Sequence, residues 1–567
     1  MEERDIIEKL LSGEITSEEL RENNNLITLA ERIYGREILD DLEISKSERG
    51  SQELQMGIGV ADVNLPDIGE EYFRDSEKKR GNGYPEEEGF LSNSRFSKMV
   101  LLAIVIRLIL APFTSDSHDM TSHLLGVLDM IDGGSPYDGF HYPYPPLVMI
   151  IYYPIFLFLS IFSDPSGWYT YSVELAELSL DVPLLEPIVT SPVFNLVWKL
   201  PLIGADLVSA YAIYRIGLIL NRGHRESKFF AGCWIFNPLS IYISSVSGQI
   251  DGMMVMFLLI SIWKLIEGKT MASGMLFALA CSVKGYVLPL FLVFLAYSGT
   301  ITSFSYSKWP KSFDKIPEKI RGASEFSITT LIVGFCFLLP MLLFEGDTVL
   351  VRRIESSFTY GGIHPVSIRN LHLSGVFGVL SNNPQEGMTG IENFLVSFQP
   401  VLRFDFSLGI IIALFVYYKS EQGWGASAFL KGIAAHCYVI IFLALGKVKS
   451  QFMMVLLPLI ILCYFAGDYS SKNKGGFPVI LAGLSCAIYS LSIVSSLYTV
   501  IPVSYTFGLP SFEFLAIVLD RDWNGDAILS NSLHQSRWGI YGPVAWIFVT
   551  YAFIDGITQT KGVESDD

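Results

Sequence analysis

Charged residues are scarce in this chain. Asp, Glu, Lys and Arg make up 17% of its 567 residues, whereas hydrophobic residues make up 50%. Soluble domains usually carry about 25% charged residues, so the composition excludes an ordinary soluble enzyme and predicts a polytopic membrane protein. The net charge of −17 lies largely in the first 95 residues and in loops. No basic patch with interleaved aromatic residues is present, so nucleic acid is not an expected partner.

Cysteine is also rare, and its spacing shows no pairs. All six cysteines lie in apolar runs and are expected to be small buried hydrophobic residues, which excludes a disulfide framework and a zinc site. The histidines and acids show no metal-ligand spacing, so no cofactor is expected; a divalent metal is compatible with the sequence but not required by it. The acidic, polar N-terminus predicts no cleavable signal peptide.

Long apolar runs are what the sequence has in abundance. Each is close to the length of about 20 residues that a membrane-crossing helix needs, or is a shorter piece of such a span. The expected fold is therefore an all-α polytopic membrane protein with about 11–13 transmembrane helices. The runs are Met99–Phe113, Leu147–Phe162, Leu200–Leu220, Phe229–Val246, Met253–Ile266, Met271–Ser298, Ile328–Phe344, Leu408–Tyr418, Ala426–Leu445, Phe452–Ala466, Val479–Val500 and Val544–Ile554.

Residues 1–95 differ from the rest of the chain. They begin with helical apolar spacing between charges and continue into a Gly-, Glu- and Ser-rich stretch, which predicts a small helical or disordered cytosolic appendage with a linker. Residues 96–560 then form the transmembrane domain. Arg95 and Lys98 precede the first span, so the N-terminus is expected in the cytoplasm and the large first loop, residues 114–146, on the external face.

The order of spans after this loop is a difficulty. The basic stretch "NRGHRESK", residues 221–228, is typical of a cytoplasmic turn and places "SGQID", residues 247–251, on the external face. Counting Leu147–Phe162 as a span does not lead to that arrangement without a re-entrant helix in residues 163–198. The sequence leaves this parity open.

The first loop holds the most suggestive acids. Leu124, Leu125, Val127, Leu128, Met130 and Ile131 fall on one side of a short helix, which is predicted to lie in the membrane interface. Asp116 and Asp119 precede this helix at the membrane surface, where a carboxylate could act as a general base. His118 and Tyr137 are candidate substrate-binding residues nearby. The alternative is a solvated external loop.

Further polar residues interrupt the apolar runs. An Asn-Pro kink precedes Gln249 and Asp251, which are candidate substrate-binding residues. Lys284 in "VKGYVLP" is at membrane depth and needs a partner such as a phosphate, unless it extends to a turn. Arg107 carries the same argument, and it could instead pair with Asp206.

Two basic segments come later in the chain. The loop of residues 351–375 contains Arg353, His364 and Arg369, which could serve an anionic ligand if the loop is external. Lys447 and Lys449 in "KVKSQF" could hold a phosphate between helix ends. Either segment could equally be an ordinary basic cytoplasmic turn.

The order of these motifs resembles a known family. An acidic first loop with "GGSPY" and "YPPL", then "NPL…SGQID", "VKGYVLP" and "KVKSQF…LP", is similar to the GT-C glycosyltransferases that use a polyprenyl-phosphate sugar such as dolichyl-phosphate mannose. The resemblance implies that Asp119 or Asp116 is the catalytic base for an inverting transfer of mannose or glucose. Lys447, Lys449, Lys284, Arg369, Arg353 and Arg107 would then be candidates for binding the donor phosphate. The "WWDYG" motif of oligosaccharyltransferases is absent.

The resemblance also sets the expected partners. They are a polyprenyl- or dolichyl-phosphate sugar, an acceptor glycan or glycolipid, and the bilayer, in the plasma membrane of a prokaryote or the endoplasmic reticulum membrane. Two other function classes fit the sequence. A transporter or flippase of lipid-linked sugar also has many proline-broken spans. A non-catalytic membrane subunit would show no dependence on Asp116 or Asp119.

Overall fold

The computed structural model describes most of the membrane part of the chain. The described residues are 90–91, 94–115, 117–137, 144–170, 188–301, 320–339, 405–420, 425–441, 450–466, 476–492, 506 and 541–558. The chain divides into two compact units, Met1–Glu86 and Glu87–Asp567, and every described residue belongs to the second unit. The predicted boundary between residues 95 and 96 stays a prediction, as does the cytosolic appendage.

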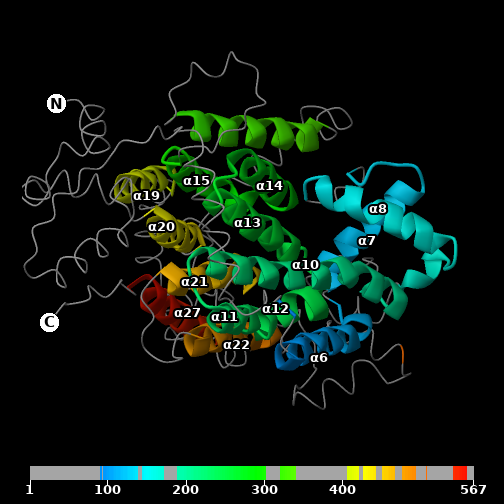
Figure 1. The fold of residues 1–567 in the computed structure, drawn as a ribbon. Helices are drawn as coiled ribbons and strands as arrows, with labels where there is room; N and C mark the ends of the chain where they lie inside the picture. Colours follow the sequence, from blue (N-terminus) through cyan, green and yellow to red (C-terminus); the bar gives the residue numbers. More distant parts are fainter. Residues whose placement is uncertain are drawn as a thin grey trace, which may run out of the picture. The chain divides into compact units, whose positions relative to one another are not determined.

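The described part is helical except for one short ladder, so the predicted all-α class is confirmed (Figure 1). β1 (Tyr169–Thr170) pairs with β2 (Ile188–Val189) in an antiparallel arrangement. The longer helices are α6 (Ser94–Leu110), α7 (Ser117–Ile131), α8 (Leu147–Ser160), α10 (Pro192–Ile219), α11 (His224–Ile235), α13 (Asp251–Ile266), α14 (Thr270–Val283), α15 (Phe291–Ser298), α19 (Asp405–Lys419), α20 (Gly425–Val439), α21 (Met453–Ala466), α22 (Gly476–Ser492) and α27 (Tyr541–Thr558).

Short helical segments join or extend these helices. They are η1 (Ala111–Phe113), η2 (Pro165–Trp168), α12 (Pro238–Ile241), the π-helix η3 (Tyr242–Ser247), η4 (Gly285–Leu290) and η8 (Ser450–Phe452).

Several helices are long and apolar enough to cross a membrane. Among the described residues these are Arg95–Phe113, Pro192–Ile219 and Ile320–Leu339, and a fourth span is added if His224–Ile235 and Pro238–Ser247, which meet at a 46° bend, are taken together. Eight further apolar helices are shorter. The polytopic membrane class is confirmed, whereas the predicted number of spans stays a prediction.

The bend between α11 and α12 is held by polar contacts. Asn237 caps α12, because its side-chain oxygen accepts a hydrogen bond from the Leu239 amide at 3.0 Å. Its side-chain amide also donates to the Val479 carbonyl of α22 at 3.4 Å. Gly483 permits this approach, since a Cβ there would lie 2.1 Å from Asn237 Oδ1. The helix therefore breaks at Asn-Pro, and the Asn237 side chain binds the break to α22.

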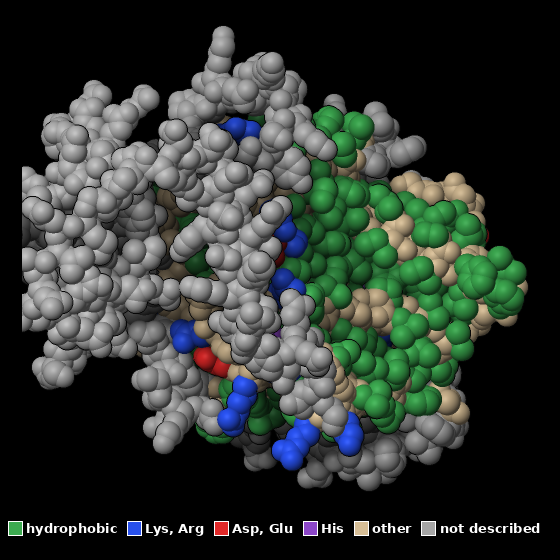
Figure 2. Space-filling model, in the orientation of Figure 1, with side chains coloured by type: hydrophobic (Ala, Val, Ile, Leu, Met, Phe, Trp, Pro, Cys, Tyr) green, Lys and Arg blue, Asp and Glu red, His purple; other side chains and the backbone are tan. Residues whose placement is uncertain are grey.

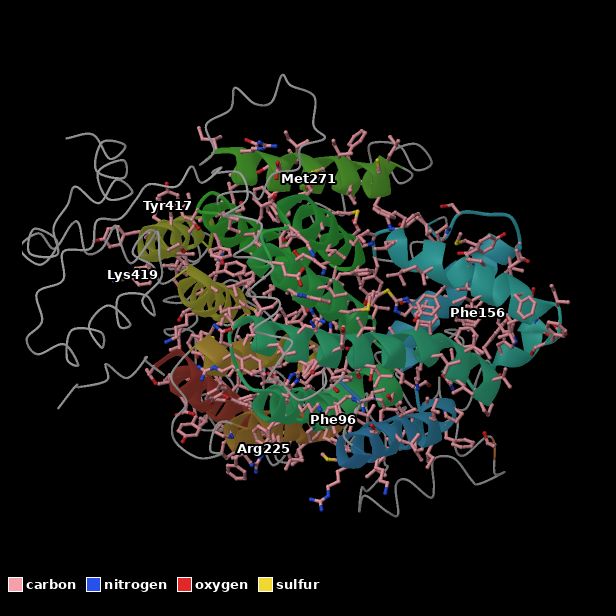
Figure 3. The ribbon with its side chains drawn as sticks, viewed as in Figure 1. Phe96, Phe156, Arg225, Met271, Tyr417 and Lys419 are labelled. Carbon is pink, nitrogen blue, oxygen red and sulfur yellow. The ribbon has the colours of Figure 1, made fainter. Side chains whose placement is uncertain are left out.

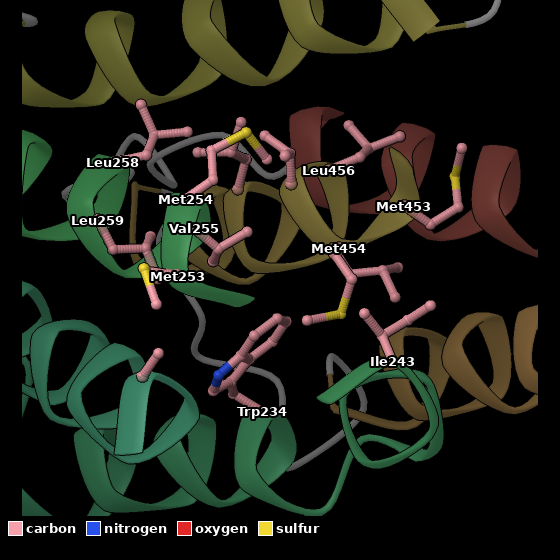
Figure 4. Close-up of a cluster of buried hydrophobic side chains, with 14 of the residues drawn as sticks. Trp234, Ile243, Met253, Met254, Val255, Leu258, Leu259, Met453, Met454 and Leu456 are labelled. Atoms are coloured by element: carbon pink, nitrogen blue, oxygen red, sulfur yellow. The ribbon is translucent and has the colours of Figure 1, made fainter. Parts of the chain in front are cut away.

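The core is formed where α11, η3, α13 and α21 meet. Figure 4 shows the buried side chains of this region, which are rich in methionine and include Trp234. α13 and α21 contribute Met253, Met254, Met453 and Met454, all at most 3% exposed. Flexible methionine side chains fill the irregular space beside the bent helix.

The two ends of the helix set carry different residues. At one end, Tyr214 of α10 hydrogen-bonds His224 of α11 at 2.8 Å, and the Arg222 guanidinium donates to the Phe465 carbonyl of α21 at 2.8 Å. This end carries the basic stretch of residues 221–228, which the positive-inside rule predicts to be cytoplasmic, so we call it the cytoplasmic end. We call the opposite end the outer end.

Helix α8 packs against the first turns of α10, at the outer end. The Tyr152 hydroxyl donates to the Trp198 carbonyl at 2.7 Å, and the rings of Phe156 and Phe194 are 4.6 Å apart. Trp198 and Phe194 belong to the first two turns of α10, so α8 runs along the outer part of α10 (Figures 1 and 3). The prediction that Leu147–Phe162 is a span stays a prediction. If α8 is not a span, α6 and α10 give the parity that the sequence left open.

Helix α7 buries part of its apolar side within the protein. Met120, Leu124 and Val127 are completely buried, and the position of the helix in the membrane interface stays a prediction. α7 packs against α8 and the segment around β2, which shield its apolar side.

Candidate functional site

Four motifs that are far apart in the sequence meet at the outer end. Lys284 Nζ lies 2.6 Å from Asp251 Oδ2, and the Tyr286 hydroxyl donates to Asp251 Oδ1 at 3.0 Å. The Tyr144 ring lies 5.1 Å from Lys284 Nζ, and the Phe452 ring contacts Tyr286 edge-on at 4.9 Å. We call these five residues the outer cluster. It joins the first loop, "SGQID", "VKGY" and "KSQF".

Local structure explains how the outer cluster forms. Asp251 is the first residue of α13, where a carboxylate is favoured by the helix dipole. Lys284 ends α14 in an extended conformation, and this break before η4 turns its side chain toward Asp251. Tyr286 follows on η4 and reaches the second oxygen of the same carboxylate.

The charges of the outer cluster are matched internally. The Lys284 and Asp251 side chains are 6% and 0% exposed, so both are largely removed from water. A buried ion pair of this kind is maintained only with good geometry and further hydrogen bonds, which Tyr286 supplies. Lys284 was predicted to bind a donor phosphate and Asp251 a substrate. The structure instead pairs the two with each other.

An aromatic stack fastens the first loop to this cluster. The His123 ring of α7 stacks on Trp198 at 4.5 Å and on Tyr144 at 5.2 Å. Trp198 in turn donates its indole N–H to the Gly248 carbonyl at 2.8 Å. Gly248 has a φ of +81°, and a Cβ there would lie 2.7 Å from Met120 Sδ. The turn after η3 therefore depends on glycine both for its conformation and for the close approach of α7.

Lys199 was missed by the sequence analysis. Its side chain is completely buried, and Nζ donates to the carbonyls of Ala111 and Val246, each at 3.0 Å. Nζ also donates to the Thr114 carbonyl and to Thr114 Oγ1. Lys199 thus ties η1, the start of the first loop and η3 together. A lysine flanked by "VW" and "LPL" at membrane depth was the signal that could have revealed it.

Arg107 lies deeper between the helices. Its Nε is 3.2 Å from Asp206 Oδ2, and Nη2 donates to Ser240 Oγ at 2.7 Å. Ser244 Oγ donates to the same Asp206 oxygen at 2.7 Å, and neither charged side chain is exposed. The structure therefore shows the alternative that the sequence left open, the pairing of Arg107 with Asp206. The predicted role of Arg107 as a phosphate-binding residue is not tested.

The other predicted site residues lie in different parts of the chain, and some lie outside the described residues. Tyr137 donates its hydroxyl to the Tyr144 carbonyl at 3.1 Å, which supports the first loop. Gln249 is 8% exposed and lies in the turn between η3 and α13. His118 and Asp119 lie on α7, but their side chains are outside the described set. Asp116, Arg353, His364, Arg369, Lys447 and Lys449 are outside the described residues altogether.

Within the described ranges, no group of three or more His, Cys, Asp or Glu side chains is arranged to hold a metal ion. The six cysteines are unpaired thiols.

The cytoplasmic turn between α13 and α14 carries its own charge network. Glu267 accepts hydrogen bonds from Lys269 Nζ at 2.8 Å, from Lys264 Nζ at 3.0 Å and from the Trp263 indole. Partial burial opposes the charged form of Glu267, but these three donors outweigh it and lower its pKa. Through these three hydrogen bonds the Glu267 carboxylate stabilises the turn beside Gly268.

Part of the chain matches a known protein family. Residues 112–352 match the family model described as GPI transamidase subunit PIG-U. The matched stretch begins in η1 and includes Tyr144, Asp251, Lys284 and Tyr286 of the outer cluster. No curated protein matches the chain.

This match corrects the functional part of the sequence analysis. The motif order was interpreted as that of a GT-C glycosyltransferase with a polyprenyl-phosphate sugar donor and a glycan or glycolipid acceptor, but the family that matches is a transamidase subunit. The assignments of enzyme class and sugar partners were wrong, and the transporter alternative has no support. The expected location in a membrane is confirmed by the apolar helices that are long enough to span one. Over residues 112–352, this integral membrane chain is similar to the PIG-U subunit of GPI transamidase.

Proposed function

We propose that this chain is a non-catalytic membrane subunit of a GPI transamidase complex, which joins glycosylphosphatidylinositol to proteins. The family match over residues 112–352 is the observation that carries the proposal. Its partners in this role are other protein subunits and the bilayer. This function belongs to the class that the sequence analysis considered third, a membrane subunit without a catalytic aspartate.

The internal pairing of the buried charges supports a scaffolding role. Glycosyl transfer needs cations that can receive a leaving phosphate. Lys284 and Arg107, two of the proposed cations, are instead bound to Asp251 and Asp206 at 2.6 and 3.2 Å. Such pairs fix helices relative to one another, which is what a subunit needs in order to present a defined outer surface.

The test is to disrupt the gene in its own host and to follow a GPI-anchored reporter protein together with the GPI lipids. We expect the reporter to remain unanchored while complete GPI lipid accumulates, because attachment fails after the lipid has been finished. Loss of a sugar transferase would instead leave a truncated lipid. A truncated lipid, or normal anchoring, would refute the proposal.

Complementation of the disrupted gene then tests whether the first loop carries a catalytic aspartate. A subunit without a catalytic aspartate predicts that Asp119→Asn and Asp116→Asn restore anchoring to at least half of the wild-type level, and that the tagged chain copurifies with the other transamidase subunits. Restoration by wild type but by neither variant, with equal amounts of chain in the membrane, would contradict this role.

A further inference from the structure

Helix α8 presents a wholly apolar face to its surroundings. Ile150, Leu157, Phe158, Ile161 and Phe162 are exposed along one side of α8 and the turn after it. No charged residue occurs between Leu147 and Phe162. The opposite side, which includes Tyr152 and Phe156, is completely buried.

Both ends of α8 lie at the outer end of the helix set. Its first turn follows Tyr144, whose ring contacts Lys284 of the outer cluster. Beyond its last turn, the Trp168 carbonyl accepts hydrogen bonds from the amides of Thr190 and Ser191, just before α10 begins at Pro192. The helix is therefore as apolar as a membrane span, yet it enters and leaves on one side.

The exposed side of α8 matches the lipid-facing sides of the spanning helices. Phe158 and Ile161 are 64% and 71% exposed, and Leu101 of α6 and Leu331 of the helix Ile320–Leu339 are 60% and 68% exposed. Figure 2 shows hydrophobic side chains over much of the face on which α8 lies. A protein–protein interface normally has a polar rim around its apolar centre, which this side of α8 lacks.

Among the exposed residues of α8 and the turn after it, the polar ones lie beyond the end of the helix. Ser163 accepts a hydrogen bond from the Trp168 indole at 2.9 Å, and the exposed Asp164 accepts one from the Ser166 amide at 3.0 Å. An apolar body that ends in an exposed charged turn is typical of a segment at the boundary between hydrocarbon and water.

We infer that α8 is a monotopic helix: it lies in the outer leaflet with Leu157, Phe158 and Ile161 among the acyl chains, and it does not cross the bilayer. The inference does not depend on the proposed function. It has a consequence for the outer cluster, because only Pro145 and Pro146 separate Tyr144 from α8. Insertion of α8 holds the cluster at the level of the outer lipid headgroups.

The first test concerns topology. Single cysteines replace Ser135, before α8, and Ser163, after it, in the full chain in sealed endoplasmic reticulum vesicles, with a membrane-impermeant maleimide as the probe. We expect both to be protected in intact vesicles and labelled at least fivefold above the natural cysteines once the vesicles are opened. Lys269→Cys in the α13–α14 turn is the cytoplasmic reference and should be labelled in intact vesicles. Labelling of Ser163→Cys in intact vesicles would show that α8 crosses the membrane and would overturn the inference.

The second test identifies what covers the helix. A photoreactive benzophenone side chain replaces Phe158 in native membranes, and the same group at Leu331 gives the spanning-helix reference. We expect phospholipid adducts at both positions, in yields within twofold of each other by mass spectrometry. A benzophenone at Asp164 is the solvent-side control, with at least fivefold less lipid adduct. Protein adducts in place of lipid at position 158 would assign this face to a partner subunit, and an adduct with neither would leave it in water; both results refute the inference.

Discussion

Three buried cations of the membrane unit each have a defined set of oxygen acceptors. Arg107 is bound by Asp206 and Ser240, Lys284 by Asp251, and Lys199 by backbone carbonyls. The sequence showed that Arg107 and Lys284 need partners, because a charge at membrane depth is costly. It did not show whether the partner is a ligand or a residue of the same chain, since the acceptors are 99 and 33 residues away.

The Lys284–Asp251 pair predicts strong coupling between two substitutions. Removal of one partner leaves a buried charge, so Lys284→Met and Asp251→Asn are each expected to lower the unfolding free energy by about 3–5 kcal/mol. The double variant should lose clearly less than the sum of the two, because neither charge then remains unpaired. Thermal unfolding of the purified chain in one detergent measures all four members of the cycle.

Additive losses would show that the two residues act separately. The exposed ion pair between Lys269 and Glu267 provides a matched control, since Lys269→Met should cost at most about 1 kcal/mol.

Glu267 predicts a pH dependence with a definite sign. Its pKa is lowered in the folded chain, so its contribution to stability is present above the unfolded pKa of about 4.3 and is lost as the pH falls through the lower folded pKa. Glu267→Gln should therefore be less stable than wild type at pH 7 and approach it below about pH 4. Melting temperatures recorded over this range of pH test the prediction.

Trp263→Phe offers a second variant for the same site, because it removes one of the three donors to Glu267 and keeps an aromatic ring. It should reduce the pH-dependent part of the stability without abolishing it. A constant difference between wild type and Glu267→Gln at every pH would contradict the assignment.

The turn that follows the π-helix depends on a glycine with a positive φ. η3 ends at Gly248, which accepts the Trp198 hydrogen bond and has a positive φ. π-helical turns are rare and often occur at functional sites. Here the turn places Asp251 at the start of α13, so the outer cluster depends on it.

Gly248→Ala tests this dependence. The new Cβ would lie 2.7 Å from Met120 Sδ and 3.0 Å from Lys199 Cε, in a conformation that alanine rarely adopts. We expect a loss of about 2–3 kcal/mol in unfolding free energy. Gly285→Ala in η4 is the matched control, since a Cβ there would have no other atom within 4 Å and should change stability by less than about 1 kcal/mol. Equal losses for both variants would refute a special role for Gly248.

Helices were predictable where an apolar run and helix-breaking residues at its ends indicated the same boundaries. α6 and α10 follow from their apolar runs, and the helix break at Asn237 follows from Asn-Pro. The contact between "SGQID" and "VKGY" follows from their positions, since the first motif lies at the start of one predicted span and the second at the end of the next. For α8 the sequence did not decide, because an apolar run of about 15 residues fits a short span and a monotopic helix equally well. The Tyr152–Trp198 and Phe156–Phe194 contacts are the observations that favour the monotopic helix.

At the scale of the whole molecule, the membrane unit begins close to its first described residue. Phe90 packs against Phe96 of α6 and against Tyr211 and Tyr214 of α10, with ring centroids 5.0–5.5 Å apart. Residues 1–86 lie outside the described residues. We expect the stability of the membrane unit to depend on Phe90 and not on residues 1–86.

A chain that starts at Glu87 should insert and unfold within about 2 °C of the full chain, because no packing within the second unit is removed. Phe90→Ala in the full chain should lower the unfolding free energy by about 1–3 kcal/mol, because three ring contacts are lost. Fluorescence-detected size-exclusion after heating compares the three proteins. A large loss of stability in the shortened chain, with no loss in Phe90→Ala, would show instead that the membrane unit depends on residues 1–86 and not on Phe90.

The pair between Arg107 and Asp206 also bears on how the protein is made. The ribosome completes α6, with its arginine, 99 residues before it reaches the aspartate. During that interval the nascent α6 carries an uncompensated positive charge at a depth where hydrocarbon disfavours it. Stable insertion of the first helix is therefore a delayed event, completed only when α10 leaves the translocon and delivers Asp206. We therefore expect α6 and α10 to become stable in the bilayer together, and their pairing to position the helices between them.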